Sequence, residues 1–282
     1  MDNPSRLTRV RDHDRTRDAT RPCRPPHARA VVHGPPRALA AAPAQGRIRL
    51  RAALLPDDSM KSSSSPLLIL LALLPISYAT TFHITNNCPY TIWPAAAPGG
   101  GLVLHPSQTW TLPISTSAAT SGQIWARANC TFNSAGRGTC LSGDCNGNLN
   151  CKSAASPPAT IVKYSLNQYG ANDFYSISLC DGFNVPVGVS PTSNCGAVRC
   201  AGHDIMRECP TELRAPGGCR SACDVFKTAD YCCNRVGKSC WPTKYSAFFK
   251  SLCPNCSTYP EDDPTSTNIC SSGGDYKITF CP

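Results

Sequence analysis

Short runs of alternating hydrophobic and polar residues dominate the second part of the chain. Such runs, rich in β-branched and aromatic residues, are typical of half-buried strands. They lie at residues 81–85, 90–93, 109–112, 123–127, 161–166, 174–179 and 276–280. Clusters of Gly, Pro and Asn separate them, so the pattern predicts a mainly β protein built as a sandwich or barrel.

The pattern changes in residues 202–253, where cysteines are frequent and apolar residues are sparse. Short helices are predicted at 221–228 and 243–252. So little apolar surface cannot stabilise this segment by itself. We therefore expect a loop-rich subdomain that is stabilised by disulfides. Adjacent cysteines such as Cys232 and Cys233 rarely bond to each other, so these two are expected to pair with different partners.

Cysteine usage indicates an oxidising compartment. Of the 19 cysteines, all but Cys23 lie between Cys88 and Cys281. They make up roughly 9% of that part of the chain, a level typical of a disulfide scaffold. Their even number allows every thiol to be paired. The alternative, metal-binding or buried thiols in a cytosolic protein, is weakened by the segment that precedes them.

Residues 60–79 have the anatomy of a secretory signal peptide. Met60 and Lys61 precede a short apolar run at 66–76, and small residues follow at 77 and 79. The run is shorter than the roughly 20 residues of a membrane-spanning helix, which weakens the alternative of a transmembrane anchor. Cleavage after Ala79 leaves 80–282 as the mature protein.

Residues 1–59 do not fit that organisation. They hold twelve Arg, six Asp and eight Pro without apolar periodicity, so we expect them to be disordered. We interpret them as an artefact of an upstream start assignment. Most of the formal net charge of +9 belongs to residues 1–61, and the rest of the chain carries only +2. The small net charge of that part therefore does not indicate a nucleic-acid partner.

Several sequence blocks resemble one known family. Residues 136–145 (GRGTCLSGDC) are followed by Cys151, and Ser142 stands where a Thr is usual. Further matching blocks are 87–93 (NCPYTIW), 165–170 (SLNQYG), 181–186 (DGFNVP), 215–219 (APGGC), 231–233 (YCC) and 280–282 (FCP). Over essentially all of 80–282 the chain resembles the thaumatin-like proteins, the pathogenesis-related group 5 of plants.

The resemblance implies a thaumatin-like β-sandwich core, a disulfide-rich domain of loops and helices at about 202–253, and a small looped domain around 130–163. It also implies eight disulfides. They are Cys88–Cys281, Cys130–Cys140, Cys145–Cys151, Cys195–Cys270, Cys200–Cys253, Cys209–Cys219, Cys223–Cys232 and Cys233–Cys240. Cys180 and Cys256 lie outside the family pattern. We expect them to form a ninth bridge, the alternative being that Cys180 is a small buried hydrophobe.

Antifungal members of the family carry an acidic cleft built from one Arg, one Glu and three Asp, and some hydrolyse β-1,3-glucan weakly with a carboxylate pair. At the matching positions this chain has Gln123 for the Arg, Lys163 for the Glu and Ser176 for the first Asp. Asp181 and one of Asp262 and Asp263 remain. A lysine with an ordinary pKa cannot replace a carboxylic acid, so hydrolysis is expected to be weak or absent.

Aromatic residues offer a second route to a ligand. Tyr169, Phe174, Tyr175 and Tyr259 lie beside cleft positions and could stack on sugar rings, or they could be core residues. The six histidines show no metal-ligand spacing, and no strained serine motif is present. We therefore expect no catalytic residue, metal or cofactor.

These observations predict a monomeric plant defence or stress protein of the apoplast. It would bind β-glucan or another microbial or cell-wall surface without strong catalysis. One alternative is a weak glucan hydrolase using Asp181 with Asp262 or Asp263. Another is an inhibitor of microbial wall-degrading enzymes. The end at Pro282, without a trailing propeptide, favours the extracellular space over a vacuole.

Overall fold

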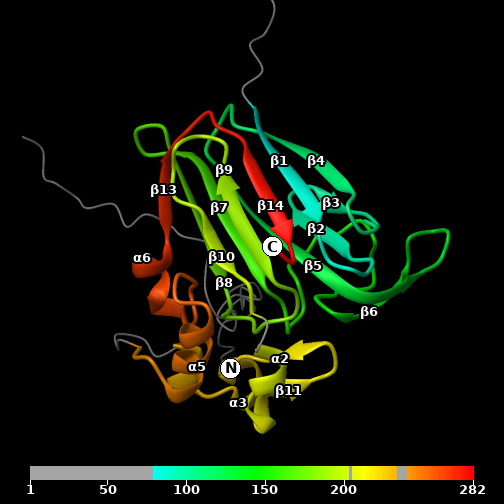
Figure 1. Ribbon diagram of the computed structural model, residues 1–282, viewed down its shortest axis with the longest axis vertical. Coiled ribbons are helices and arrows are strands. Elements are labelled where there is room, and N and C mark those ends of the chain that lie inside the picture. The colour runs from blue at the N-terminus through cyan, green and yellow to red at the C-terminus, as the bar shows by residue number, and fades with distance from the viewer. Residues whose placement is uncertain (1–78, 203–204, 234–239) are drawn as a thin grey trace, which may run out of the picture. The chain divides into compact units, whose positions relative to one another are not determined.

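Two β-sheets and a helical region form the part of the chain that the computed structural model describes, residues 79–202, 205–233 and 240–282 (Figure 1). The predicted leader at 1–59 and all of the predicted signal peptide except Ala79 lie outside the described residues. Within the described part, no helix has the length and apolar character needed to span a membrane.

The first sheet has five strands in the order β10-β9-β14-β1-β4. Their bounds are Ala79–Asn86 for β1, Thr109–Ser115 for β4, Val187–Pro191 for β9, Val198–Cys200 for β10 and Tyr276–Phe280 for β14. The first and last strands of the described chain, β1 and β14, are parallel neighbours, with Ile84 opposite Ile278.

The second sheet follows the order β13-β8-β7-β5-β2-β3, with β6 paired to β5. Its strands are β2 (Trp93–Ala97), β3 (Gly100–Gly101), β5 (Thr120–Phe132), β6 (Gly138–Ser142), β7 (Ile161–Gln168), β8 (Asn172–Ser178) and β13 (Asn268–Ser271). The central neighbours β5, β7 and β8 are all antiparallel, so their side chains alternate between two faces in matching rows.

Side chains from both sheets form one hydrophobic core. Phe82 of β1 packs against Tyr164 of β7, with ring centroids 4.7 Å apart. Ile84, Ile177 and Ile278 are fully buried in the same cluster. The predicted mainly β fold with a thaumatin-like sandwich core is confirmed, because alternation on each sheet directs one set of side chains into the shared interior.

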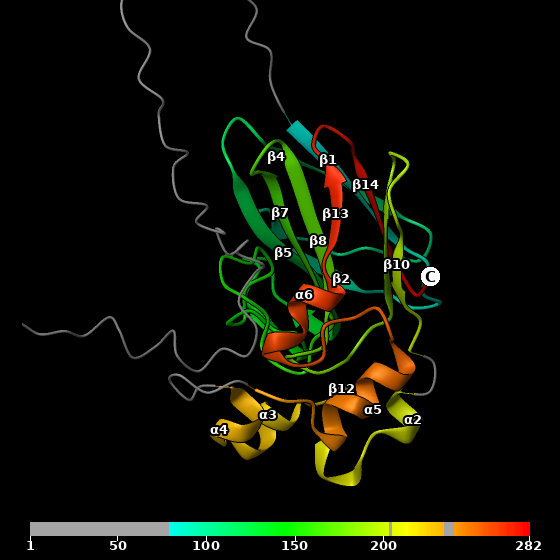
Figure 2. The same cartoon turned by 90° about the vertical axis from the view of Figure 1, so that its left-hand side faces the viewer.

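The helical region lies at one end of the two sheets (Figures 1 and 2). Its elements are α2 (Ile205–Glu208), η1 (Thr211–Leu213), β11 (Arg214–Ala215), β12 (Gly218–Cys219), α3 (Ala222–Phe226), α4 (Ala229–Cys232) and α5 (Lys244–Leu252). η2 (Pro260–Asp262) and α6 (Asp263–Ser266) then lead into β13. Thr243 and Ser246 form a capping box at the start of α5, which is why the helix begins there.

Arg127 holds the looped segment after β6 against the second sheet. Its guanidinium donates to the carbonyls of Trp93, Asn148 and Leu149 at 2.7–2.9 Å. Burial lowers the pKa of Arg127 to about 10, an effect that Asp144 partly offsets. The guanidinium therefore serves as a structural clamp between the sheet and the loop.

The structure contains the eight disulfides that the resemblance implies. They are Cys88–Cys281, Cys130–Cys140, Cys145–Cys151, Cys195–Cys270, Cys200–Cys253, Cys209–Cys219, Cys223–Cys232 and Cys233–Cys240. Cys232 and Cys233 bond to different partners, as their adjacency requires.

The predicted bridge between Cys180 and Cys256 is wrong. Cys256 is a free, buried thiol, whereas Cys180 is disulfide-bonded, so the two are not joined to each other. The residue that reaches Cys180 is Ser257, which pairs with Ser178 of β8 and has its Oγ 3.9 Å from Cys180 Sγ. The sulfur of Cys256 instead lies within 4.8 Å of those of Cys200 and Cys253.

The disulfide that joins the ends of the described chain is expected to be the most stabilising. Cys88 and Cys281 are 193 residues apart, whereas Cys130 and Cys140 are 10 apart. On the loop-entropy account, removing both cysteines of the long bridge costs about 5 kcal/mol, against about 3 kcal/mol for the short one. Denaturant unfolding of the Cys88→Ala/Cys281→Ala and Cys130→Ala/Cys140→Ala variants measures both, and equal losses would contradict the expectation.

Candidate functional site

Three of the predicted cleft residues form one row across the second sheet. Gln123 of β5 is the direct partner of Lys163 of β7, and Lys163 is the direct partner of Ser176 of β8. All three lie on the face opposite the hydrophobic core, because Ile124 and Ile177, their neighbours along the strands, point into it. We call Gln123, Lys163 and Ser176 the polar row.

Two atoms of the polar row lack hydrogen-bond partners. Gln123 Oε1 and Ser176 Oγ are buried and make no hydrogen bond. Buried polar atoms nearly always have a hydrogen-bond partner. Two unpartnered atoms in one row therefore suggest a place where a ligand donates or accepts a hydrogen bond. Lys163 is also buried, and its amine brings a positive charge to a position where the family has a carboxylate.

Asp181 lies in the loop after β8, which is attached to the helical region. Phe183 and Cys219 of β12 exchange two backbone hydrogen bonds of 2.8 Å. This close approach requires Gly182, which has φ +88°, and a Cβ there would lie 2.4 Å from the Cys219 carbonyl oxygen. The Asp181 side chain is half-buried at this junction.

Asp262 is part of a buried hydrogen-bond network. Lys250 Nζ lies 3.0 Å from both of its carboxylate oxygens. Thr258 donates to Oδ2 through its backbone N–H and its hydroxyl, and the Thr265 hydroxyl donates to Oδ1. Burial alone would raise the pKa of Asp262, but these donors outweigh burial and lower it. Both oxygens are fully engaged, so Asp262 holds structure together; the side chain of Asp263 is not described.

Three of the predicted aromatic residues, which lie in β8 and in the turn before it, have different environments in the structure. Tyr169 lies at the turn between β7 and β8 and is 62% exposed. Phe174 is half-buried on the face of the polar row, two residues before Ser176. Placing Tyr175 in the cleft is wrong: it is 1% exposed, belongs to the core, and donates its hydroxyl to the carbonyl of Gly196. Strand alternation sends it to the opposite face from Phe174.

A hollow lined by aromatic side chains lies between the helical region and the segment 258–260. It is a shallow depression, and the roughly 380 Å³ of space within its outline includes open solvent. Its aromatic lining residues are Tyr231, Trp241, Tyr245, Phe249 and Tyr259. Ser221, Thr243, Ser246 and Thr258 also line it. We call this site the aromatic hollow.

Packing and hydrogen bonds fix several walls of the aromatic hollow. The Tyr231 and Tyr245 rings meet edge to face at 5.6 Å, and the Tyr245 hydroxyl donates to Glu212 Oε1 at 2.6 Å. Trp241, in contrast, is 75% exposed, the largest exposed fraction among the described large hydrophobic residues. A large apolar ring held open to solvent beside hydroxyl groups has the character of a sugar-stacking platform.

The polar row and the aromatic hollow are neighbours. Ser176 and Ser178 share one face of β8, roughly 7 Å apart along the strand. Ser178 pairs with Ser257, and the next residue, Thr258, lines the hollow.

Sequence reasoning named Tyr259 but missed Trp241, Tyr231 and Tyr245. Tyr231 and Trp241 lie between the two predicted helices and Tyr245 lies in the second, so nothing in the pattern placed the three in one site. The one available signal was a tryptophan between Cys240 and Pro242, where no apolar neighbours could bury it.

The comparisons with known proteins agree with this architecture. The model of the thaumatin family matches residues 86–282. The pathogenesis-related thaumatin-like protein 3.2 of Cryptomeria japonica is 52% identical over 208 residues, which are 72% of this chain and 88% of that protein. A thaumatin-like protein of Actinidia deliciosa is 48% identical over 223 residues, 78% of this chain and 97% of that protein. The chain belongs to the thaumatin family.

Two solved structures are also similar. One is the thaumatin-like xylanase inhibitor TLXI, with 28% identity and a TM-score of 0.42, covering 71% of this chain and 99% of that one. The other is the protein elicitor MoHrip2 from Magnaporthe oryzae, with 14% identity and a TM-score of 0.32, covering 72% of this chain and 99% of that one.

Removing the Asp262 carboxylate should destabilise the protein in a pH-dependent way. Asp262→Asn breaks a largely buried ion pair and is expected to lower the free energy of unfolding by about 2–3 kcal/mol at neutral pH. The folded pKa lies below the unfolded value, so the carboxylate stabilises fully above the unfolded pKa, roughly 3.9. That contribution is lost as the pH falls through the folded pKa.

Denaturant unfolding at several pH values measures this effect. The difference between wild type and Asp262→Asn should shrink in acid. Glu208→Gln is the control, because its partner Arg207 and Glu208 itself are exposed and such pairs contribute little. A difference between wild type and Asp262→Asn that stays constant down to strongly acidic pH would contradict the assignment.

Proposed function

We propose that this protein is a secreted plant defence protein that binds a neutral cell-wall polysaccharide in the aromatic hollow, without hydrolysing it. The defence role is supported by relatives named as pathogenesis-related proteins. Secretion is supported by eight disulfides, which persist in oxidising compartments. The single observation that carries the binding proposal is the exposed Trp241 at the mouth of an aromatic and hydroxyl-lined hollow.

The chemistry of the hollow matches a sugar chain. The faces of aromatic rings pack on the apolar faces of pyranose rings, so the aromatic lining of the hollow suits a sugar chain. β-1,3-Glucan is the substrate class that the family resemblance suggests.

The charge of the site favours a neutral ligand over a cationic one. Lys163 replaces an acidic residue of the family pattern, and Gln123 and Ser176 carry no charge. A cationic surface would be drawn to a groove of carboxylates, and the polar row offers none. Neutral hydroxyl-rich polymers do not depend on that attraction.

Hydrolysis is disfavoured by the state of Asp262. A glycosidase needs one carboxyl group that gives a proton and a second that attacks or activates water. Five contacts from Lys250, Thr258 and Thr265 saturate Asp262, and its lowered pKa keeps it ionised. It is therefore neither a proton donor nor a free base to complement Asp181.

Binding to insoluble β-1,3-glucan should depend on Trp241. Loss of one stacking ring in Trp241→Ala is expected to weaken binding about tenfold. A pull-down with increasing amounts of glucan gives the apparent Kd. Because Trp241 is exposed, the variant should fold and unfold as the wild type does.

Tyr169→Ala is the matched control, since Tyr169 is a strongly exposed aromatic residue like Trp241 but lies outside the hollow. Its binding should equal that of the wild type. Undiminished binding by Trp241→Ala, or an equal loss in Tyr169→Ala, would show that the hollow is not the binding site.

No reducing sugar should be released while the polysaccharide is bound. A reducing-sugar assay on the pelleted glucan, run beside the pull-down, measures this. Product release by the wild type that disappears in Asp181→Asn would overturn the non-catalytic proposal and favour the hydrolase.

A further inference from the structure

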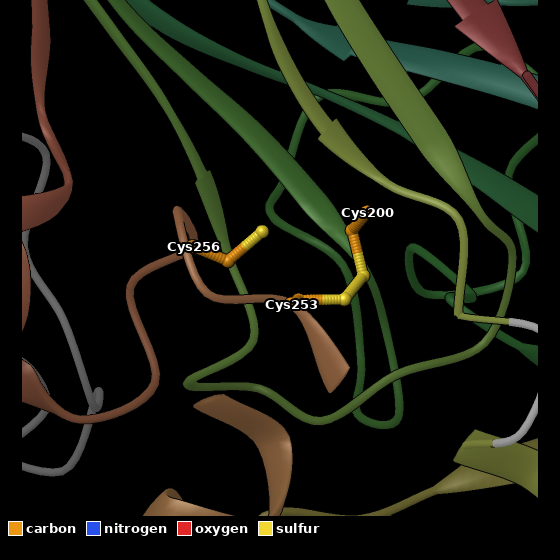
Figure 3. A group of neighbouring side chains, drawn as sticks. All are labelled: Cys200, Cys253 and Cys256. Atoms are coloured by element: carbon orange, nitrogen blue, oxygen red, sulfur yellow. A yellow bond between two sulfur atoms is a disulfide. The ribbon is translucent and has the colours of Figure 1, made fainter. Parts of the chain in front are cut away.

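Three sulfur atoms gather where β10 meets the end of α5. Cys200 ends β10 and is bonded to Cys253, the residue that follows α5. Sγ of the free Cys256 lies within 4.8 Å of both of these sulfurs. In Figure 3 the Cys256 side chain lies on the same side of its backbone as the disulfide. A thiol and a disulfide this close are the two reactants of an exchange reaction.

The backbone between Cys253 and Cys256 already favours an alternative bridge. The N–H of Cys256 donates to the carbonyl of Cys253 at 3.1 Å, which closes a four-residue turn. Such a turn holds its first and last Cα atoms less than about 7 Å apart. Disulfides span nearly the same range, up to about 6.8 Å. The sequence Cys253-Pro254-Asn255-Cys256 has the Cys-X-X-Cys spacing in which exchange-active cysteines occur.

We propose that Cys256 is an internal nucleophile that exchanges the Cys200–Cys253 disulfide for a Cys253–Cys256 disulfide. The Cys256 thiol first loses its proton, and its sulfur then bonds to Cys253 Sγ. The Cys200–Cys253 bond breaks, and Cys200 Sγ leaves with the electron pair and takes up a proton. One thiol and one disulfide are present before and after, so the reaction requires neither an oxidant nor a reductant.

The surroundings of Cys256 keep this reaction slow in the folded protein. Burial raises the pKa of the Cys256 thiol to about 12, Lys250 of α5 opposes that rise, and Asp262 of η2 adds to it. Those are the charged groups that act on the thiol among the described residues. Only a small fraction of the thiol is ionised at neutral pH, and exchange proceeds through the thiolate.

Exchange would remove the covalent link between the first sheet and the end of α5. The Cys200–Cys253 bridge closes a segment of sequence separation 53 that contains α2 to α5. The alternative bridge closes only the turn. Tyr231, Trp241 and Tyr245 belong to the segment that the original bridge closes, whereas Tyr259 follows the turn. The exchanged isomer would therefore lose the fixed separation between opposite walls of the aromatic hollow.

Thiol mapping over time tests the proposal on the full chain. The protein is incubated without reductant at neutral and mildly alkaline pH, quenched with acid and denatured. Free thiols are alkylated, and peptides are mapped without reduction. The label should start on Cys256 and move to Cys200 as a Cys253–Cys256 peptide appears. The rate should rise about tenfold per pH unit, because every pH used lies below the pKa of the thiol.

Cys256→Ala is the control, with Cys256→Ser as a second variant if the first folds poorly. Both should keep the Cys200–Cys253 bridge, and Cys200 should stay unlabelled. Three results would overturn the proposal. The label could remain on Cys256 throughout, Cys256 could be blocked by a bridge at the start, or Cys200 could become labelled at the same rate in the variants.

Discussion

The parallel pairing of β1 with β14 is the constraint on which the rest of the structure depends. Parallel neighbours need a crossover connection, and here the connection is nearly the whole described chain. Pairing of β14 with β9 on its other side sets the strand order of the first sheet. The Cys88–Cys281 bridge and the hydrogen bond from the Asn87 N–H to the Phe280 carbonyl fix the register at the strand ends. Ile84 and Ile278 are thereby held side by side in the core that both sheets share.

The strands with strong alternation could be predicted from the sequence, and the weak ones could not. The run 276–280 coincides with β14, and 161–166 lies within β7. β6, β10 and β13 were missed, because they have three to five residues and obtain their stability from a neighbouring strand and a nearby disulfide. The pairing of sixteen cysteines came from the family resemblance, since spacing leaves many pairings open. The even number of cysteines led to a wrong prediction for Cys256, whose thiol stays free beside the Cys200–Cys253 disulfide in the folded chain.

The residues of the candidate site also divide into those that the sequence identified and those that only the folded structure revealed. Alignment of short blocks identified Gln123, Lys163 and Ser176, and the sheet register places them as direct partners. The role of Asp262 could not be predicted, because its donors Lys250, Thr258 and Thr265 converge only in the folded chain. Trp241 lacked any periodic context and became a candidate only once its exposure beside the hollow was known.

The Lys250 ammonium couples the aromatic hollow to the sulfur cluster. It donates to Asp262, which in turn receives two hydrogen bonds from Thr258 in the wall of the hollow. It also donates to the carbonyl of Cys256 at 2.9 Å, and the Ser266 hydroxyl donates to the same carbonyl. The half-buried Lys250 ammonium therefore contacts both the ligand-facing segment and the turn that presents the free thiol. Asp262 is buried and would lose its charged partner without Lys250, so the two sites are expected to order and to loosen together.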